Sequence, residues 1–378
     1  MGPSAPAERH FSREEIERAR AYHRPLYASF AASAALGVGY LAAVTSSAAG
    51  RWLAAPVDDL SRWAFAAAFP ALVVVAGAVL RFPLSFWRGY VHEHRWGFST
   101  QSPAGFVSDW AMGLAVSVAL TGAAVMAFVE LASRFPRTWR LIAAPAAAGL
   151  AVVLSFLAPV VFEPMFNRFR PLADEQLAAD LRALSRRAGV PVREVLVADA
   201  SRRTHKENAY VSGLGRTRRV VVYDTLLARG SPQEVRLVVA HELGHRRERH
   251  VALATALGAA GAAVAVVVLW LLLRWHPVLA ASGATGPADP RIAPLLLLAA
   301  TAMELVTLPF GAAVSRRWEA AADRASIELT GDPDGFAGME RNLAVANLLD
   351  LAPSRPVYLL LFSHPTPAER IEAAMAGG

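Results

Sequence analysis

The sequence contains no cysteine and a single lysine, Lys206, among its 378 residues. The absence of cysteine excludes disulfide bonds, thiolate metal sites and cysteine nucleophiles. Histidine and carboxylate side chains are left as the candidate metal ligands. Because arginine carries almost all of the positive charge and alanine is abundant, the composition indicates a GC-rich bacterial genome.

Charged residues are also scarce, at 18% of the chain, whereas hydrophobic residues make up 54%. The apolar residues are clumped rather than periodic and the mean hydropathy is positive, which argues against an ordinary soluble protein. Six apolar stretches are each long enough to cross a hydrocarbon core. They lie at about 27–49, 63–82, 108–131, 141–161, 251–273 and 292–314. The predicted fold is mainly α: a polytopic membrane protein with about six transmembrane helices.

The net charge of +7 does not indicate nucleic-acid binding, because the arginines gather at the ends of the apolar stretches. Arginines in such places anchor spans in the lipid bilayer and set their orientation. The tail 1–26 carries five of them, so the positive-inside rule predicts a cytosolic N-terminus. The tail lacks the apolar core of a signal peptide, and the first span is therefore expected to be retained.

Alternation of the spans then places three polar segments, 83–107, 165–250 and 315–378, on the cytosolic side. One loop disagrees with this arrangement. Its arginines lie between the third and fourth spans, on the predicted outer side: Arg134, Arg137 and Arg140. Together with the bacterial composition, the pattern predicts a protein of the bacterial inner membrane whose larger polar segments face the cytosol.

The polar segment 165–250 has the pattern of a mixed α/β unit. Leucines at helical spacing precede Gly189, and the runs REVLVAD and RRVVVYD are rich in β-branched residues. Further on, Ser231 is a suitable N-cap, Pro232 suits the first turn and Glu234 completes a capping box. A helix is therefore predicted to begin at about residue 232 and to carry the motif HELGH in its third turn.

The histidines of HELGH, His241 and His245, are four residues apart, so on a helix they project from one face and can share a metal ion. Imidazole nitrogens bind zinc and leave a coordination position for a water molecule, whose pKa the metal lowers toward about 7. Glu242 is placed to take a proton from that water. The pentapeptide alone is not sufficient, because a catalytic zinc site needs a third protein ligand.

The candidate third ligand is Glu319, in the segment SRRWEAAAD that follows the sixth span. It would complete the set of two histidines and one carboxylate found in catalytic zinc sites. Asp323, one helical turn further on, can accept a hydrogen bond from a ligand imidazole and fix its tautomer. Between His245 and Glu319 the chain crosses the membrane twice, so both ligand-bearing helices emerge on the same side.

The chain is accordingly divided into five predicted regions. These are a cytosolic tail at 1–26, a four-helix membrane region at 27–164, a first catalytic part at 165–250, two transmembrane helices at 251–314 and a second catalytic part at 315–378. The two catalytic parts together are predicted to form a cytosolic α/β domain of the zincin type, with one Zn²⁺ per chain and a peptide or protein as the expected substrate.

Several blocks of sequence resemble the type 1 CAAX prenyl protease family of membrane zinc peptidases. Besides HELGH and SRRWEAAAD, they are GYVHEHRWGFSTQSPAGFVSD at 89–109, FNRFRPL at 166–172, SRRTHKENAYVSGLGRTRRVVVYDTLL at 201–227 and SHPTPAERI at 363–371. Their order and spacing extend over most of the chain. The resemblance implies a cage of membrane helices around a large chamber, capped by the catalytic domain.

Position by position, the resemblance implies roles for eight residues. The zinc ligands are His241, His245 and Glu319, and the catalytic base is Glu242. Substrate contacts are implied for Asn208, Ala209, His364 and Arg370. Of these, Asn208 and Ala209 lie on an edge strand that pairs with the substrate backbone, while His364 and Arg370 lie near the active site, where they stabilise an oxyanion or hold a carboxylate.

The sequence departs from the family in two respects. Members typically have seven spans, whereas six are counted here, and the tail SREEIERARAYHR resembles the segment that follows the family's first helix. That first helix is therefore expected to be missing from this sequence. A bacterial host also lacks protein prenylation, so unprenylated membrane-associated or cytosolic peptides are the expected substrates.

Two alternative functions fit parts of the pattern. A quality-control membrane metalloprotease of the heat-shock type shares HExxH and the later glutamate, but four spans before the catalytic domain and FNRFRPL favour the first interpretation. A non-catalytic membrane scaffold with a structural zinc site is the other, and the intact Glu242 argues against it because structural sites need no adjacent base.

Two further ionisable residues attract attention. His250 lies five residues after His245, off the ligand face, and is interpreted as structural. Glu304 lies inside the sixth span, where a carboxylate is costly. It either faces a wet interior or is neutral and hydrogen-bonded.

A reporter fused after Gly378 tests the predicted topology. Six spans and a basic N-terminal tail place both ends of the chain on the cytosolic side, so a cytosol-active reporter is expected to give signal and a periplasm-active one none. A periplasmic signal contradicts the six-span arrangement.

Overall fold

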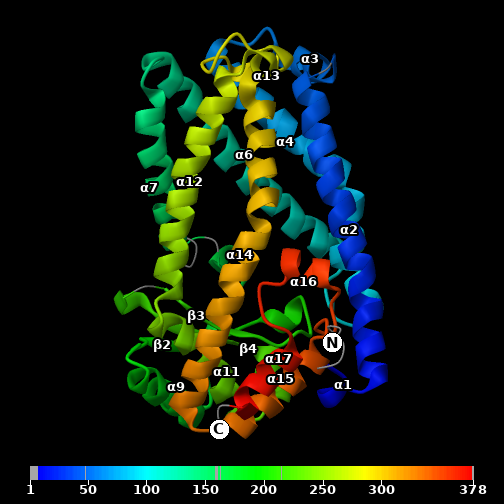
Figure 1. The fold of residues 1–378 in the computed structure, drawn as a ribbon, viewed down its shortest axis with the longest axis vertical. Coiled ribbons are helices and arrows are strands. Elements are labelled where there is room, and N and C mark those ends of the chain that lie inside the picture. Colours follow the sequence, from blue (N-terminus) through cyan, green and yellow to red (C-terminus); the bar gives the residue numbers. More distant parts are fainter. Residues whose placement is uncertain (1–6, 47, 158–160, 162, 214, 377–378) are drawn as a thin grey trace.

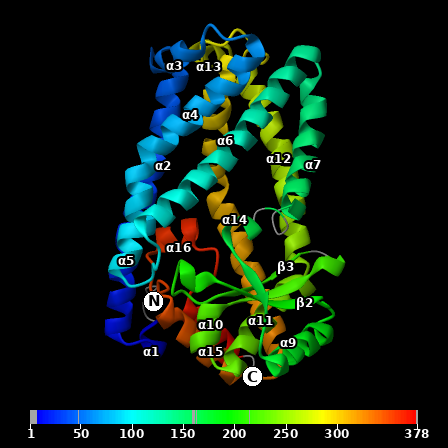
Figure 2. The same ribbon diagram turned by 180° about the vertical axis from the view of Figure 1, so that it is seen from behind.

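The computed structural model of the protein describes residues 7–46, 48–157, 161, 163–213 and 215–376. Long helices form one end of the molecule, and a smaller unit with a β-sheet forms the other, where both ends of the chain also lie (Figure 1). In the view from behind, α6 crosses the bundle diagonally while α7 and α12 run side by side (Figure 2). The molecule is thus an elongated helical bundle with a compact base.

Six helical segments of the described chain have the length and apolar composition of membrane spans, at 13–46, 62–95, 103–134, 139–157, 250–274 and 290–330. They confirm the six predicted stretches, apart from residues 47 and 158–160, which lie outside the described residues. Their main helices are α2 Arg13–Ser46, α4 Arg62–Phe86, α6 Pro103–Arg134, α7 Trp139–Leu157, α12 His250–Arg274 and α14 Ala293–Thr330. In the fourth and fifth segments only 6% of the apolar window is buried, so most of these side chains depend on lipid for cover.

Several long helices continue past their apolar stretch into the base of the molecule. The helix α4 extends through a π-helical turn, η2 Trp87–His92, into α5 Glu93–Arg95. At the opposite end of the bundle lie short connecting elements, α3 Ala48–Ala54, η1 Ala55–Val57, α13 His276–Ala281 and η6 Pro290–Ile292 (Figure 1). Glu304 is exposed on α14 inside the sixth candidate span, and its environment stays a prediction.

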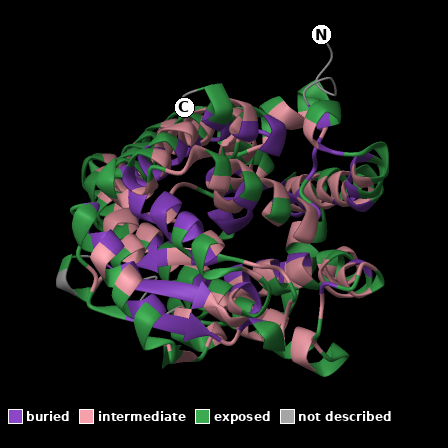
Figure 3. Cartoon of the chain, turned by 90° about the horizontal axis from the view of Figure 1, so that it is seen from below, coloured by how far each residue is buried: buried purple, intermediate pink, exposed green. Residues whose placement is uncertain are grey.

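The base contains a four-stranded sheet in the order β1-β2-β4-β3. Its strands are β1 Phe169–Pro171, β2 Glu194–Ala198, β3 Ala209–Ser212 and β4 Arg219–Tyr223. The strands β2 and β4 are parallel and are the two predicted β-rich runs, whereas β1 and β3 pair antiparallel at the two edges. Buried residues gather on these strands and on the helices beside them, and the outer helix faces are exposed (Figure 3). The edge position of β3 agrees with the predicted location of Ala209.

Helices cover the sheet and close the base. They are α1 Ala7–His10, α8 Glu163–Phe166, α9 Glu175–Arg187, η4 Ala200–Arg202, η5 Gly215–Thr217, α10 Asp224–Arg229, α11 Pro232–Arg247, α15 Pro333–Ala346, α16 Arg355–Leu361 and α17 Pro367–Ala376. The amphipathic helix α9 buries Leu177, Leu181 and Leu184 against the core that the sheet and α11 share. The apolar residues of these elements therefore form the rigid support of α11.

The helix α11 begins as predicted. The Ser231 hydroxyl accepts a hydrogen bond from the Glu234 N–H at 3.2 Å, and the Glu234 carboxylate accepts one from the Ser231 N–H at 2.7 Å. This capping box satisfies two of the free N–H groups at the helix start. The helix ends near Arg249, whose left-handed backbone (φ 59°) separates α11 from α12.

Gly244 allows α11 to approach α14 closely. A Cβ atom at this position would lie 2.8 Å from the carbonyl oxygen of Ala322 and 3.1 Å from its Cα. These are backbone atoms and cannot turn away as a flexible side chain would. The glycine of HELGH is therefore required by the contact that brings α11 and α14, the helices with the predicted ligands, together.

We expect Gly244→Ala to lower the thermal unfolding temperature of the purified protein and its metal content. The added methyl group overpacks the contact, at a cost of about 1–3 kcal/mol, and forces α14 away from α11. Gly258→Ala on α12 is the matched control, because a Cβ there meets nothing within 4 Å. Equal behaviour of the two variants would show that the close approach is unimportant.

Candidate metal centre

Three predicted ligands converge where α11 and α14 meet. The Nε2 atoms of His241 and His245 are 3.1 Å apart. Glu319 Oε2 lies 3.2 Å from His241 Nε2, and Glu319 Oε1 lies 3.3 Å from His245 Nε2. One possible ligand atom from each of the three residues lies within 4.8 Å of the other two. The structure thus forms a compact cluster although Glu319 follows His245 by 74 positions in the sequence.

This cluster fits a tetrahedral cation. Ligand atoms bound at about 2.0–2.1 Å in tetrahedral geometry are separated by about 3.3 Å, which the observed donor distances approach. Glu319 Oε2 is buried and makes no well-aligned hydrogen bond within the described residues. Lone pairs that face each other at such distances repel unless a proton or a metal ion lies between them. The chemistry of the donor set therefore suits zinc.

Asp323 holds the outer nitrogen of His241. Its Oδ1 lies 2.8 Å from His241 Nδ1, which directs Nε2 toward Glu319 and fixes the useful tautomer. Burial alone would lower the pKa of His241, but the neighbouring carboxylates of Asp323 and Glu319 outweigh it and raise this pKa to about 10. The carboxylates thus create a field that favours a cation at this position.

Arg370 contacts Asp323, and its Nη2 also lies 3.4 Å from His241 Nδ1. Its Nε and Nη2 donate to the two oxygens of Asp323 at 2.9 and 2.6 Å, and its Nη1 pairs with Glu340 Oε2 at 2.7 Å. The guanidinium is buried between the two carboxylates. These contacts support a positioning role for Arg370, and its predicted contact with substrate stays a prediction.

His250 occupies the equivalent place behind His245. Their Nδ1 atoms lie 3.0 Å apart, and the His250 ring is stacked on Trp318 with 5.3 Å between ring centroids. The residue is off the ligand face, as its spacing predicts, yet it reaches the outer nitrogen of a ligand because the chain turns at Arg249. Sequence reasoning missed this contact, and it also missed Glu340, which no motif connects to the site.

Glu242 and His364 lie next to the cluster. Burial raises the pKa of Glu242, which is half-buried one residue after His241. His364 Nε2 lies 3.4 Å from Glu319 Oε1, and its Nδ1 is 2.8 Å from the Ser363 hydroxyl. The structure therefore brings a carboxylate and a third imidazole to the cluster that the two histidines and Glu319 form.

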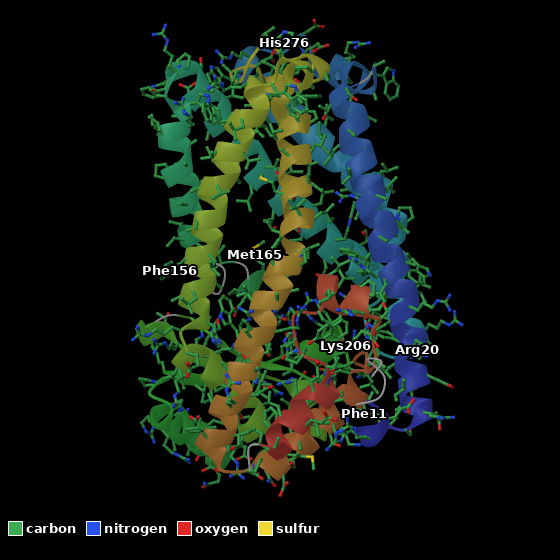
Figure 4. The ribbon with its side chains drawn as sticks, in the orientation of Figure 1. Phe11, Arg20, Phe156, Met165, Lys206 and His276 are labelled. Atoms are coloured by element: carbon green, nitrogen blue, oxygen red, sulfur yellow. The ribbon has the colours of Figure 1, made fainter. Side chains whose placement is uncertain are left out.

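A cavity of about 1050 Å³ joins this region to the edge of the sheet. Both His364 and Asn208 line it, together with Lys206 and Glu93. The Lys206 ammonium, labelled in Figure 4, pairs with Glu93 at 2.8 Å and so is already neutralised. The Asn208 carbonyl accepts a hydrogen bond from Tyr223 N–H at 3.0 Å, which extends the β3–β4 ladder by one residue.

A helical membrane fold in which two imidazoles and a carboxylate meet beside a glutamate defines a membrane metalloprotease. The chain belongs to peptidase family M48, whose model matches residues 171–376. A second model, described as CAAX prenyl protease N-terminal with five membrane helices, matches residues 2–168. Within that range the described residues contain four candidate spans.

Known proteins of similar sequence or fold agree with this assignment. An uncharacterized metalloprotease, YhfN, of Bacillus subtilis is 29% identical over 326 residues, 86% of this chain and 76% of that protein. The CAAX prenyl protease 1 of Saccharomyces cerevisiae is 30% identical over 184 residues, 48% of this chain and 41% of the yeast protein. The crystal structure of S. mikatae Ste24p has the same fold, with a TM-score of 0.80 at 23% identity, covering 96% of this chain and 89% of that one.

These comparisons confirm the resemblance to the CAAX prenyl proteases, the mainly helical membrane fold and the assignment as a metalloprotease. The division into five regions, the enclosed chamber and the roles of individual site residues stay predictions.

Proposed function

We propose that the protein is a zinc-dependent endopeptidase that hydrolyses unprenylated peptides of membrane-associated or cytosolic proteins on the cytosolic face of a bacterial inner membrane. The observation that carries the proposal is the convergence of His241, His245 and Glu319 beside Glu242. Membership of family M48 and the fit of the donor atoms to a tetrahedral cation support it.

In this proposal each residue has a defined task. His241, His245 and Glu319 would hold the zinc ion, which when bound polarises a carbonyl group and lowers the pKa of water toward about 7. Glu242 takes the proton of the attacking water and passes it to the nitrogen of the leaving peptide. The raised pKa of Glu242 suits a group that must both accept and release a proton near neutral pH.

The substrate is proposed to lie along β3 as an added strand. In the antiparallel pairing with β4, Asn208 lies opposite Tyr223 and Tyr210 lies opposite Val221. The backbone N–H and C=O groups of Asn208 and Tyr210 therefore point toward β4. Ala209 and Val211 then direct theirs outward. The Val211 carbonyl accepts a hydrogen bond from Arg246, so among the described residues the outward-facing backbone nearest Asn208 is that of Ala209, which is itself buried.

His364 is proposed to face the scissile carbonyl. It lies 3.4 Å from Glu319 and lines the cavity that also reaches Asn208. A donor in this position can stabilise the negative charge that develops on the carbonyl oxygen. Asp323 and Arg370 are proposed to act indirectly. Asp323 holds His241 in its ligating orientation, and Arg370 holds Asp323.

Neither alternative has an observation in its favour. The match of an N-terminal CAAX prenyl protease model to residues 2–168 favours the present proposal over a quality-control protease of the heat-shock type. A scaffold with a structural zinc site would need neither Glu242 nor a donor set that leaves room for water.

The division of labour between His241 and Glu242 provides the test. Glu242→Gln keeps the shape of the side chain and removes the base. The purified variant is therefore expected to contain about one zinc per chain but to cleave about 10²–10⁴-fold more slowly than the wild type. His241→Ala is expected to lose both metal and activity. Zinc content is measured by mass spectrometry and cleavage with a library of unprenylated peptides.

Glu248→Gln is the matched control, because Glu248 is exposed just beyond α11. It is expected to retain zinc and activity. Cleavage by Glu242→Gln at the wild-type rate would refute the mechanism, and a wild-type protein that binds no zinc would refute the metal site.

A further inference from the structure

A second cavity, of about 740 Å³, lies behind the metal centre between α14, α16 and α17. At the base of the molecule α14 contacts both α16 and α17, and Tyr358 of α16 donates a hydrogen bond to Glu369 of α17 (Figure 1). Small side chains create the space, with Ala313 and Ala320 on α14 facing Ala373 and Ala374 on α17. The cavity is separate from the one that joins His364 to Asn208.

Positive charge dominates this cavity. Its lining contains four arginines, Arg316, Arg317, Arg324 and Arg370, against two carboxylates, Asp323 and Glu369. The charges of Asp323 and Arg370 neutralise each other. The Glu369 carboxylate accepts hydrogen bonds from the Thr366 N–H and from the Tyr358 hydroxyl.

The other three arginines have no carboxylate partner within the described residues. Arg316 donates to the carbonyl oxygens of Tyr358 and Phe362 at 3.1 and 2.6 Å, so its charge is held in place but not neutralised. Arg317 and Arg324 are exposed, and no ion pair or hydrogen bond of either guanidinium occurs in the described chain. Two guanidiniums are therefore available to a ligand.

The two available arginines lie on one face of α14. Arg317 and Arg324 are seven residues apart, about 10.5 Å along the helix, with Ala320 between them. Long side chains at this spacing can approach one anion from above and below. A phosphate group presents the oxygen atoms that guanidinium donors prefer.

The same helix face is apolar above the arginines. Val306 and Phe310, 66% and 70% exposed, precede Ala313 and Arg317 at spacings of three or four residues. Arg317 follows directly after the apolar stretch that ends near residue 314, so the cavity lies at the level where a bilayer surface is expected. A ligand with an acyl chain and an anionic headgroup matches this succession of apolar and basic residues.

We propose that this cavity binds the phosphate of an anionic phospholipid headgroup, with the acyl chains along the exposed apolar face of α14. Basic pockets at the membrane surface bind such headgroups, and each arginine near the surface contributes attraction to anionic lipid. The inference is independent of the peptidase function, because lipid retention is measured without cleavage.

The experiment measures how much dioleoyl phosphatidylglycerol the purified full chain retains in detergent, by native mass spectrometry, with dioleoyl phosphatidylcholine as the zwitterionic competitor. The double variant Arg317→Gln/Arg324→Gln is expected to reduce retention of phosphatidylglycerol by roughly 30-fold. Arg24→Gln is the matched control, since Arg24 is an exposed arginine just before the first span that does not line the cavity. It is expected to lose much less phosphatidylglycerol than the double variant, because only general surface attraction is removed.

A third variant, Ala320→Leu, leaves the charge unchanged and fills space between the arginines. A defined site predicts that it also loses phosphatidylglycerol, whereas general surface attraction predicts no effect. Thermal unfolding of each variant confirms that it is folded.

Three results would overturn the proposal: equal retention of the two lipids by the wild type, equal loss in Arg24→Gln and the double variant, or full retention by Ala320→Leu. In a separate arm, inorganic phosphate alone is added at millimolar concentration. If it displaces phosphatidylglycerol completely, the site takes a free anion and not a lipid.

Discussion

The contact between α11 and α14 is the constraint on which the rest of the structure depends. Glu319 lies 74 positions after His245 and meets it only because α12 leads into the membrane region and α14 returns from it. The close approach at Gly244 then sets the spacing between the donor atoms. The membrane topology and the geometry of the candidate metal centre are therefore one arrangement, in which the returning helix carries both Glu319 and Asp323.

Buried charges around this contact are ordered in alternation. Glu319 faces the two imidazoles, Asp323 lies between His241 and Arg370, and Glu340 holds the far side of Arg370. A buried charge is tolerated only with a partner of opposite charge. Each charged side chain in this series therefore orients the next. The alternation explains how residues on α11, α14, α15 and α17 keep one imidazole nitrogen directed at a metal position.

Local patterns were sufficient to predict much of this arrangement. Apolar runs predicted the six spans, Ser231 and Glu234 predicted the start of α11, and the spacing in HELGH predicted a shared face. The contacts of His250 and Glu340 could not be predicted, because they depend on the turn at Arg249 and on the packing of α15. The π-helical turn at Trp87–His92 and the cavity behind α14 likewise arise from tertiary packing.

X-ray absorption at the zinc edge tests the central claim most directly. The purified wild type is expected to show a low-coordinate shell at about 2.0–2.1 Å with two imidazole ligands and oxygen donors. In Glu319→Gln the two-imidazole signal should persist while the oxygen shell changes and zinc is bound more weakly. A shell with a different number of imidazoles, or one that Glu319→Gln leaves unchanged, would contradict the account.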